Sequence, residues 1–308
     1  MTAAATQPLS TPRPMTPMQR QWARFRRNRL AVASAWMLLA VATACAVSVP
    51  WTHAMSVATD LAQARRPPSA HALLGTDLLG RSMAARCLFG GVISLAVGLA
   101  AASISVLLGV AWGAVAGWSG GRTDAVMMRI VDVLYGLPYI LLVILLKLGL
   151  DGLLRHRLGL RAETTNVVIL LLAIGGVSWL TMARVIRGQV LALKVQPFIE
   201  AAQALGLPTG RILIVHILPN IVGPILVYAT LTVPQAILQE SFLSFLGIGI
   251  QPPMPSWGNL AAEGVTAINN VASFWWQLLF PCALLTTTLL CLNFIGDGLR
   301  DAFDPKTA

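Results

Sequence analysis

Five long stretches of this sequence carry no charge, and this feature limits the possible fold more than any other. Residues 30–59, 87–121, 164–183, 212–239 and 264–296 contain no Asp, Glu, Lys or Arg. A helix of about 20 residues crosses the roughly 30 Å hydrocarbon core of a bilayer. A charged side chain at the middle of such a helix costs roughly 2.5–3.5 kcal/mol on insertion scales, so windows like these are typical of membrane spans. The sequence therefore predicts an all-α polytopic membrane protein.

A sixth, shorter span is predicted between the second and third of these windows. Residues 133–146 are free of charge, with Arg129 and Asp132 before them and Lys147 after them. Long basic side chains at the ends of a span can reach the polar headgroups, which extends the usable helix to about 20 residues. Pro138 lies inside this segment. We expect it to kink the helix rather than break it.

Charge composition agrees with a membrane protein and argues against nucleic-acid binding. Only 11% of the residues are charged, compared with about 25% in soluble domains. The formal net charge is +10, but the basic residues flank apolar blocks instead of forming one phosphate-binding face. The four Cys and four His are dispersed along the chain. This spacing supports no metal site and predicts buried free thiols.

The placement of basic residues predicts the orientation. With the N-terminus inside the cell, the cytoplasmic segments hold 14 of the 22 Lys and Arg residues, and six Arg lie within residues 1–29. Both termini are therefore expected to be cytoplasmic. The first apolar block is too long and too far from the start for a cleaved signal, so it is read as an uncleaved first span. In the second span, glycines at positions 109, 113 and 117 predict close packing of two helices.

A short amphipathic helix is predicted in the cytoplasmic loop between the fourth and fifth spans. Pro197 suits the first turn of a helix, and Glu200 lies where the helix dipole favours an acid. Gly206 fits the position after the helix end, where φ is positive, and Pro208 stops any continuation. One apolar stripe results at helical spacing, comprising Phe198, Ala201, Ala202 and Leu205. This stripe is expected to dock in a groove of a partner protein.

The same loop resembles the EAA loop of binding-protein-dependent ABC importer permeases. Glu200-Ala201-Ala202, then Gly206, then Ile217-Leu218-Pro219 follow that pattern. The resemblance implies a type I permease fold in which the loop is a coupling helix seated in a cleft of an ATPase subunit. The residues it implies for coupling are Phe198, Glu200, Ala201, Ala202, Leu205, Gly206 and Pro208.

Other motifs extend the resemblance to oligopeptide and dipeptide permeases, and most closely to their C-type subunit. Residues 71–81 resemble the family's outer segment before the second span, and 240–258 its outer loop after the fifth. The C-terminal residues 293–305, which end in Asp304-Pro305, are similar to its closing signature. The resemblance implies an outer gate or a receptor-facing surface that includes Asp77, Arg81, Glu240, Pro253 and Trp257.

The resemblance also implies the organisation of the chain. It predicts a cytoplasmic tail, a first transmembrane helix, an extracytoplasmic segment, a five-helix permease core with its coupling loop, and a second cytoplasmic tail. The corresponding ranges are 1–29, 30–52, 53–86, 87–299 with the loop at 194–211, and 300–308.

The predicted function is that of a permease subunit in the bacterial inner membrane, which moves oligopeptides or dipeptides and is not an enzyme. No Gly precedes any of the three Lys, so there is no P-loop. No cofactor is expected in this chain, and ATP and Mg²⁺ are expected on two ABC ATPase subunits. The other expected partners are a sibling B-type permease, an extracytoplasmic peptide-binding protein and the lipid bilayer. Glutathione, nickel chelates or antimicrobial peptides stay open as alternative cargo, and an ion-gradient-driven transporter or channel as an alternative class.

Overall fold

The computed structural model describes residues 17–157, 159, 161–268 and 273–303, and these are almost entirely helical. Both expected tails are described only in part, since 1–16 and 304–308, with Asp304-Pro305, lie outside the described residues. Five helical segments are long and apolar enough to cross a membrane. They are Arg29–Val57, Met83–Ser119, Thr164–Lys194, Thr209–Phe245 and Trp276–Phe303. Each overlaps one of the five charge-free windows, so the prediction of a polytopic all-α protein is confirmed.

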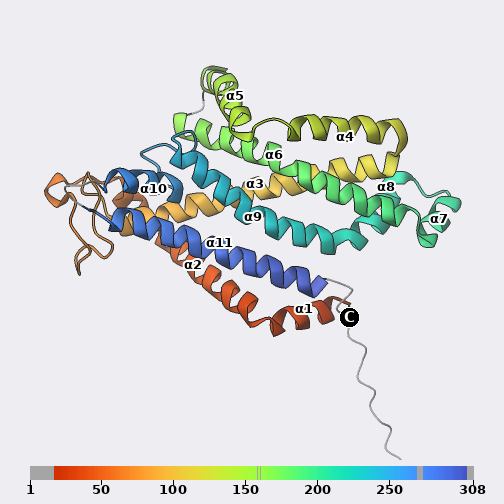
Figure 1. The fold of residues 1–308 in the computed structure, drawn as a ribbon, viewed down its shortest axis with the longest axis horizontal. Helices are drawn as coiled ribbons and strands as arrows, with labels where there is room; N and C mark the ends of the chain where they lie inside the picture. The colour runs from red at the N-terminus through yellow and green to blue at the C-terminus, as the bar shows by residue number, and fades with distance from the viewer. Residues whose placement is uncertain (1–16, 158, 160, 269–272, 304–308) are drawn as a thin grey trace, which may run out of the picture.

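The long helices run between two ends of the molecule (Figure 1). They are α2 (Arg29–Val57), α3 (Met83–Ser119), α6 (Ala162–Lys194), α9 (Val222–Phe245) and α11 (Trp276–Phe303). One end carries α1 (Pro17–Arg27), α7 (Pro197–Ala204) and α8 (Thr209–Arg211). We call it the α7 end. The opposite end carries residues 60–82, with η1 (Leu61–Gln63), and α10 (Trp257–Thr266). We call it the α10 end.

The third predicted span is broken, and the expectation of a mere kink is wrong. It consists of α4 (Gly121–Tyr135) and α5 (Tyr139–Gly152) with its π-helical extension η2 (Leu153–Arg157), and the two parts are bent by 93°. Pro138 ends the first part, since a proline has no N–H to donate and disfavours helical geometry at Leu137 before it. Its own backbone is extended, with φ −60° and ψ 118°. The span count is six only if this bent pair is taken as one span.

Ion pairs hold α4 along α6 and so favour the break. Arg187 forms a two-point contact with Asp124, with both N–O distances at 2.5 Å. Arg184 donates to Asp132 at 2.9 Å, and its guanidinium lies 4.4 Å from the ring centre of Tyr135. These contacts fix the direction of α4, so the chain must turn at Pro138.

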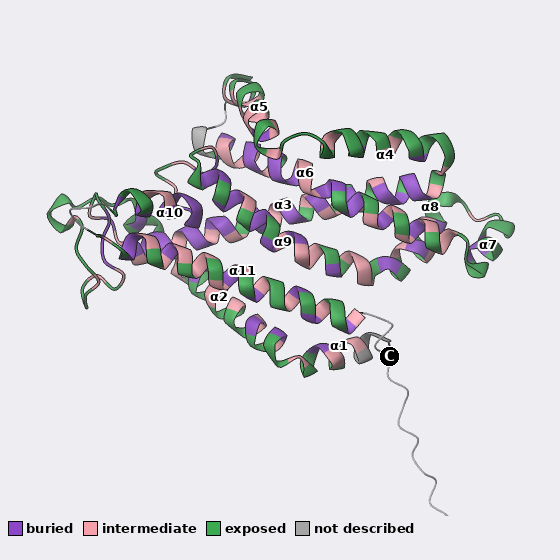
Figure 2. Cartoon of the chain, viewed as in Figure 1, coloured by how far each residue is buried: buried purple, intermediate pink, exposed green. Residues whose placement is uncertain are grey.

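The core of the bundle is the contact between α3 and α6. A Cβ added at Gly109 would lie 2.5 Å from Met182 Cβ, one at Gly113 would lie 2.4 Å from the Ala183 carbonyl oxygen, and one at Gly117 would lie 2.9 Å from the Arg187 carbonyl oxygen. The three glycines therefore let the two backbones approach each other, as the four-residue spacing predicts. Figure 2 shows buried residues concentrated along α3, α6 and α9, while α2 and α4 are largely exposed.

Replacing Gly113 by alanine should destabilise the protein, because the new methyl group would meet a backbone oxygen that cannot move cheaply. The expected loss is about 1–3 kcal/mol, typical of overpacking. Gly176→Ala is the control, since nothing lies within 4 Å of a Cβ at that position on α6. Thermal unfolding of the detergent-purified protein should show a lower midpoint for Gly113→Ala alone. Equal midpoints would contradict the packing described above.

Candidate functional site

The first candidate site is the surface of helix α7, at the α7 end of the molecule. Its backbone starts as predicted, with Pro197 in the first turn and Glu200 among the first four residues. The N–H groups of Ile199 and Glu200 both donate to the Gln196 carbonyl, at 2.9 and 3.1 Å. The helix is thus anchored directly behind α6, from which only Val195 and Gln196 separate it.

The C-terminal end of α7 is closed by a pair of backbone hydrogen bonds. The Leu207 N–H donates to the Ala202 carbonyl at 3.2 Å, and the Gly206 N–H donates to the Gln203 carbonyl at 2.9 Å. This double contact is the Schellman motif, which needs positive φ at the first of its two donor residues. Gly206 supplies it with φ +74°, so the predicted conformation is confirmed.

The apolar residues of α7 divide between two faces, which corrects the single predicted stripe. Ala202 is buried together with Ile199, which the stripe did not include. Both pack against the α6 residues Ile186 and Val190 and against the helical turns that precede α9. Those turns are η3 (Ile212–Ile217) and η4 (Leu218–Ile221). The inward face thus fastens α7 to two of the long helical segments.

The outward face of α7 remains apolar and uncovered. Leu205 is 81% exposed, Phe198 is 45% exposed, and Ala201 is also exposed. Glu200 and Pro208 are exposed beside them. Apolar side chains presented together at the tip of a capped helix are the arrangement that a groove-binding helix needs.

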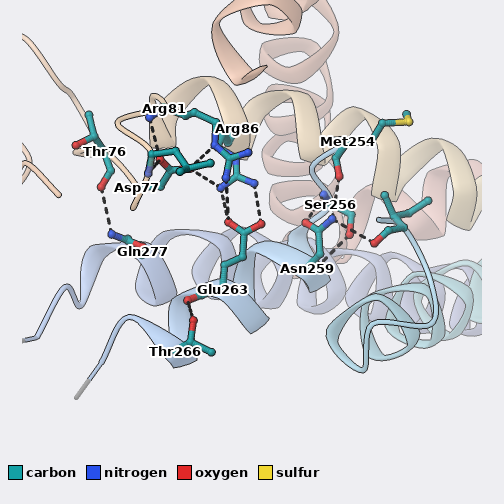
Figure 3. A network of polar contacts seen from close by, with 12 residues as sticks. Thr76, Asp77, Arg81, Arg86, Met254, Ser256, Asn259, Glu263, Thr266 and Gln277 are labelled. Atoms are coloured by element: carbon teal, nitrogen blue, oxygen red, sulfur yellow. Dashed lines mark hydrogen bonds and ion pairs between the residues drawn. The ribbon is translucent and has the colours of Figure 1, made fainter. Parts of the chain in front are cut away.

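The second candidate site is a polar cluster at the α10 end (Figure 3). Arg86, in the first turn of α3, is 1% exposed and reaches two carboxylates. Its Nη1 lies 2.8 Å from Asp77 Oδ2 and 2.5 Å from Glu263 Oε2, and its Nη2 lies 2.9 Å from Glu263 Oε1. Arg81 adds contacts of 2.6 Å to Asp77 and 3.5 Å to Glu263. This cluster joins residues 60–82, α3 and α10.

Two neighbouring hydrogen bonds attach residues 60–82 to α11. The carbonyl oxygen of Thr76 accepts hydrogen bonds from the side chains of Trp276 at 3.1 Å and Gln277 at 3.3 Å. The remaining Asp77 oxygen, Oδ1, accepts from the backbone N–H groups of Leu79 and Arg81 at 2.9 and 2.8 Å. The Asp77 carboxylate is therefore fully satisfied, and it organises the turn around itself.

The sequence analysis singled out Asp77 and Arg81 but not Arg86 or Glu263, which complete the cluster. Arg86 and Glu263 lie 177 residues apart in the chain, so no local pattern connects them. One signal was available, because Glu263 is the only charged residue between Glu240 and Asp297. An isolated acid among apolar blocks needs a buried partner, and Arg86 is that partner.

The other outer residues are placed differently from one another. Trp257 is fully buried, and its indole N–H donates to the Cys87 carbonyl at 3.0 Å. Its ring fills the packing between α10 and α3, where Gly91 makes room for it, so Trp257 presents no exposed surface, and its place in an outer gate or receptor-facing surface stays a prediction. Glu240 is likewise buried and accepts hydrogen bonds from the hydroxyls of Ser241 and Ser244 at 3.2 and 2.8 Å. Of the predicted outer set, only Pro253 is exposed.

A polar cavity that sequence reasoning missed lies where α5 meets the loop after α9. It has a volume of about 660 Å³, and its charged lining groups are Lys147, Asp151 and Arg155. Lys147 donates to the Ile248 carbonyl at 2.9 Å, and Arg155 pairs with Asp151 at 2.9 Å. The break at Pro138 carries these residues out of the bundle, so their meeting with Ile248 could not be read from a straight span.

Among the described residues, no three of His, Cys, Asp and Glu gather in a way that could hold a metal ion. The four Cys are free thiols, and all except the half-buried Cys282 are buried.

Two family models match the chain. Residues 109–308 match the binding-protein-dependent transport system inner membrane component, and residues 16–68 match the N-terminal TM domain of oligopeptide transport permease C. Among similar proteins, the dipeptide transport system permease protein DppC of Bacillus subtilis is 43% identical over 94% of this chain and 85% of its own length. The oligopeptide transport system permease protein OppC of the same organism is 42% identical over 92% of this chain and 88% of its own length. The OppC protein of Escherichia coli is 44% identical over 92% and 89%, respectively.

The Arg86 contacts predict a large loss of stability when this side chain is neutralised. Arg86→Gln should cost about 3–5 kcal/mol, because two carboxylates would lose their most deeply buried cation and would share only Arg81. The loss of stability should lie near the lower limit of this range, because the Glu263 side chain is 30% exposed. Thermal unfolding and limited proteolysis within residues 60–82 would measure the effect.

Arg155→Gln is the matched control, since it breaks the ion pair between Arg155 and Asp151. The Arg155 side chain is 38% exposed and the Asp151 side chain is 33% exposed. Such an exposed pair contributes about 0–1 kcal/mol. A protein with Arg86→Gln that unfolds at the same temperature as the control would show that the buried cluster does not hold the α10 end.

Proposed function

This chain belongs to the family of binding-protein-dependent transport system inner membrane components, and we propose that it is the C-type permease subunit of an ATP-driven peptide importer. Its similarity to oligopeptide and dipeptide permeases covers more than nine-tenths of the chain. The cargo that this supports is an oligopeptide or a dipeptide. The competing idea of an ion-gradient-driven transporter or channel has no support among these relatives.

The observation that carries the proposed mechanism is the exposed apolar face of α7. An exposed Leu205 beside Phe198 is unfavourable in water, so a partner surface should cover it. In our proposal that surface is a cleft of an ATPase subunit, and ATP with Mg²⁺ binds to the ATPase rather than to this chain. Two such ATPases, a sibling B-type permease and an extracytoplasmic peptide-binding protein would complete the importer.

The inward face of α7 shows how movement of a partner would reach the spans. Ile199 is fully buried against Ile186 and Val190 of α6 and Ile217 before α9. Packed side chains transmit displacement because the interior has little free volume. A pull on α7 would therefore move the ends of α6 and α9 with it, as a rigid-body gate movement requires.

Replacing Leu205 by glutamine tests this coupling without disturbing the fold. Its side chain is 81% exposed, so no intramolecular packing is lost. A central apolar anchor contributes about 2 kcal/mol to an interface, which corresponds to about 30-fold weaker engagement. Peptide uptake by cells that carry Leu205→Gln should fall by at least about tenfold, while the amount and unfolding temperature of the protein stay unchanged.

Gln203→Ala is the control for this experiment, because Gln203 is exposed on the same helix but outside the apolar stripe. Uptake should be close to that of the unchanged protein. Normal uptake by Leu205→Gln would contradict docking through this face. Loss of uptake together with loss of folded protein would contradict the claim that Leu205 packs against nothing in its own chain.

The orientation is part of the proposal and rests on the distribution of basic residues. The α7 end, with α1 and the end of α11, would face the cytoplasm, and the α10 end would face outward. A membrane-impermeant maleimide should label Gln203→Cys only from the cytoplasmic side and Ser69→Cys only from the outside, since both positions are exposed. Ser256→Cys is fully buried and should be protected from both sides. Labelling of Gln203→Cys from outside would reverse the orientation.

A further inference from the structure

Helices α1 and α2 meet at the α7 end (Figure 1). The side chains of the two helices line an apolar groove there. The chain turns at Asn28, whose side-chain Oδ1 accepts the Ala31 N–H at 3.1 Å and caps α2. The groove has a volume of about 260 Å³, and all but one of its lining side chains are apolar. The apolar ones are Trp22, Phe25, Val32, Ala35, Trp36 and Leu39.

One wall of the groove is fixed and the other faces away from the protein. Phe25 is 7% exposed and packs with Ala302 at the end of α11. Trp22 stacks on Phe25 with ring centres 5.6 Å apart, but it is 54% exposed, and Trp36 on α2 is 68% exposed. Figure 2 shows the outer surface of α2 as largely exposed. The groove is therefore held open by the fold and is uncovered within this chain.

The groove itself carries one positive charge, that of Arg26, and we call this residue with Arg27 and Arg29, which follow it in the sequence, the arginine margin. Arg26 is the single charged lining residue, and its guanidinium lies 5.2 Å from the ring centre of Trp22. Arg26, Arg27 and Arg29 are exposed. Within the described part of the chain, the ion pairs found involve none of these three side chains. The first acidic residue of the sequence is Asp60, at the opposite end of α2.

We propose that this groove binds an anionic phospholipid, with an acyl chain against Trp22 and Trp36 and the phosphate paired with Arg26 and Arg27. The groove opens on the apolar surface of a spanning helix, where acyl chains are the surrounding solvent. Its arginines lie at the end of that helix, at the depth of the headgroups. A phospholipid joins these two chemistries at this spacing. A second copy of the chain would bring three more arginines to the same place and would be repelled.

This site gives α1 a function separate from transport chemistry. An amphipathic helix that combines aromatic residues with arginines is suited to lie in the interface of a membrane. A bound anionic lipid would neutralise the arginine margin and fasten α1 to α2. The inference does not depend on the cargo or on the ATPase contact.

Native mass spectrometry of the full-length chain, in the complex in which it purifies, tests the proposal. Dioleoyl phosphatidylglycerol and dioleoyl phosphatidylcholine share the same acyl chains and differ in charge, so they are the two probes. Phosphatidylglycerol should bind in preference to phosphatidylcholine. The double variant Arg26→Gln with Arg27→Gln should weaken that binding by about fivefold per arginine, the contribution of one basic residue at an anionic surface.

Two matched controls separate this site from general effects of charge and bulk. Arg122→Gln with Arg129→Gln removes the same charge from exposed positions on α4, on the far side of the bundle from α1 (Figure 1), and should leave lipid binding unchanged. Ala35→Trp fills the groove without altering charge and should abolish the preference, whereas Ala33→Trp, exposed outside the groove lining, should not.

Equal binding of the two lipids would overturn the proposal. Unchanged binding in the Arg26 and Arg27 variant or in Ala35→Trp would also overturn it, as would an equal loss in the Arg122 and Arg129 control. Disulfide-linked dimers formed by Trp36→Cys in membranes would assign the groove to a second copy and would likewise overturn it. None of these readouts depends on peptide uptake, so their failure is distinct from failure of the proposed function.

Discussion

The close contact between α3 and α6 is the interaction on which the other elements depend. Lipid offers no hydrophobic drive for helix association, so two spans join when their backbones can approach and pack closely. Gly109, Gly113 and Gly117 allow this approach over three consecutive turns of α3. The pair then provides both ends of the molecule with a fixed support. A single residue separates α4 from α3, and α4 is ion-paired to α6. Two residues separate α7 from α6.

This central pair also relates the two candidate sites to each other. Arg86 extends from the first turn of α3 into the polar cluster at the α10 end. Ile186 and Val190, near the last turns of α6, hold the buried face of α7 at the other end. A displacement of α7 therefore acts on a helix whose packing partner begins inside the outer cluster. This geometry makes α3 and α6 the bodies that would move together.

The sequence predicted those features that depend on solvent and on local geometry. Charge-free windows located the spans because lipid excludes charge from a helix centre wherever that helix packs. The end of α7 was predictable because a Schellman motif needs positive φ, and Gly206 was the residue that could adopt it without strain. The residues exposed on α7 were only partly predictable. Helical spacing places Ala202 in the stripe, but in the structure it is buried together with Ile199, in one cluster with the turns before α9.

The features that sequence reasoning missed depend on contacts between distant segments. Pro138 alone is compatible with a kinked helix, and the break became a 93° bend because Asp124 and Asp132 are paired to α6. The resemblance placed Trp257 in an outer gate or a receptor-facing surface, but the ring is buried. Its burial depends on Gly91, 166 positions earlier, whose missing side chain leaves room for the indole. In each case the deciding partner lies on another helix.

The position of α2 outside the central pair explains why this helix has a different surface. α2 packs on α3 and α11 and leaves much of its length to the surroundings, with Trp36, Val47 and Trp51 more than 60% exposed. A helix in that position is stabilised by lipid as much as by protein, so its ends need contacts at the headgroups. Residues 26–29 supply them on the side where α1 turns back, since three of the four are arginines that form no ion pair with the residues that the structure describes. Two helices thus hold the α7 end in position. α6 holds it from within the bundle, and α1 holds it from the membrane surface.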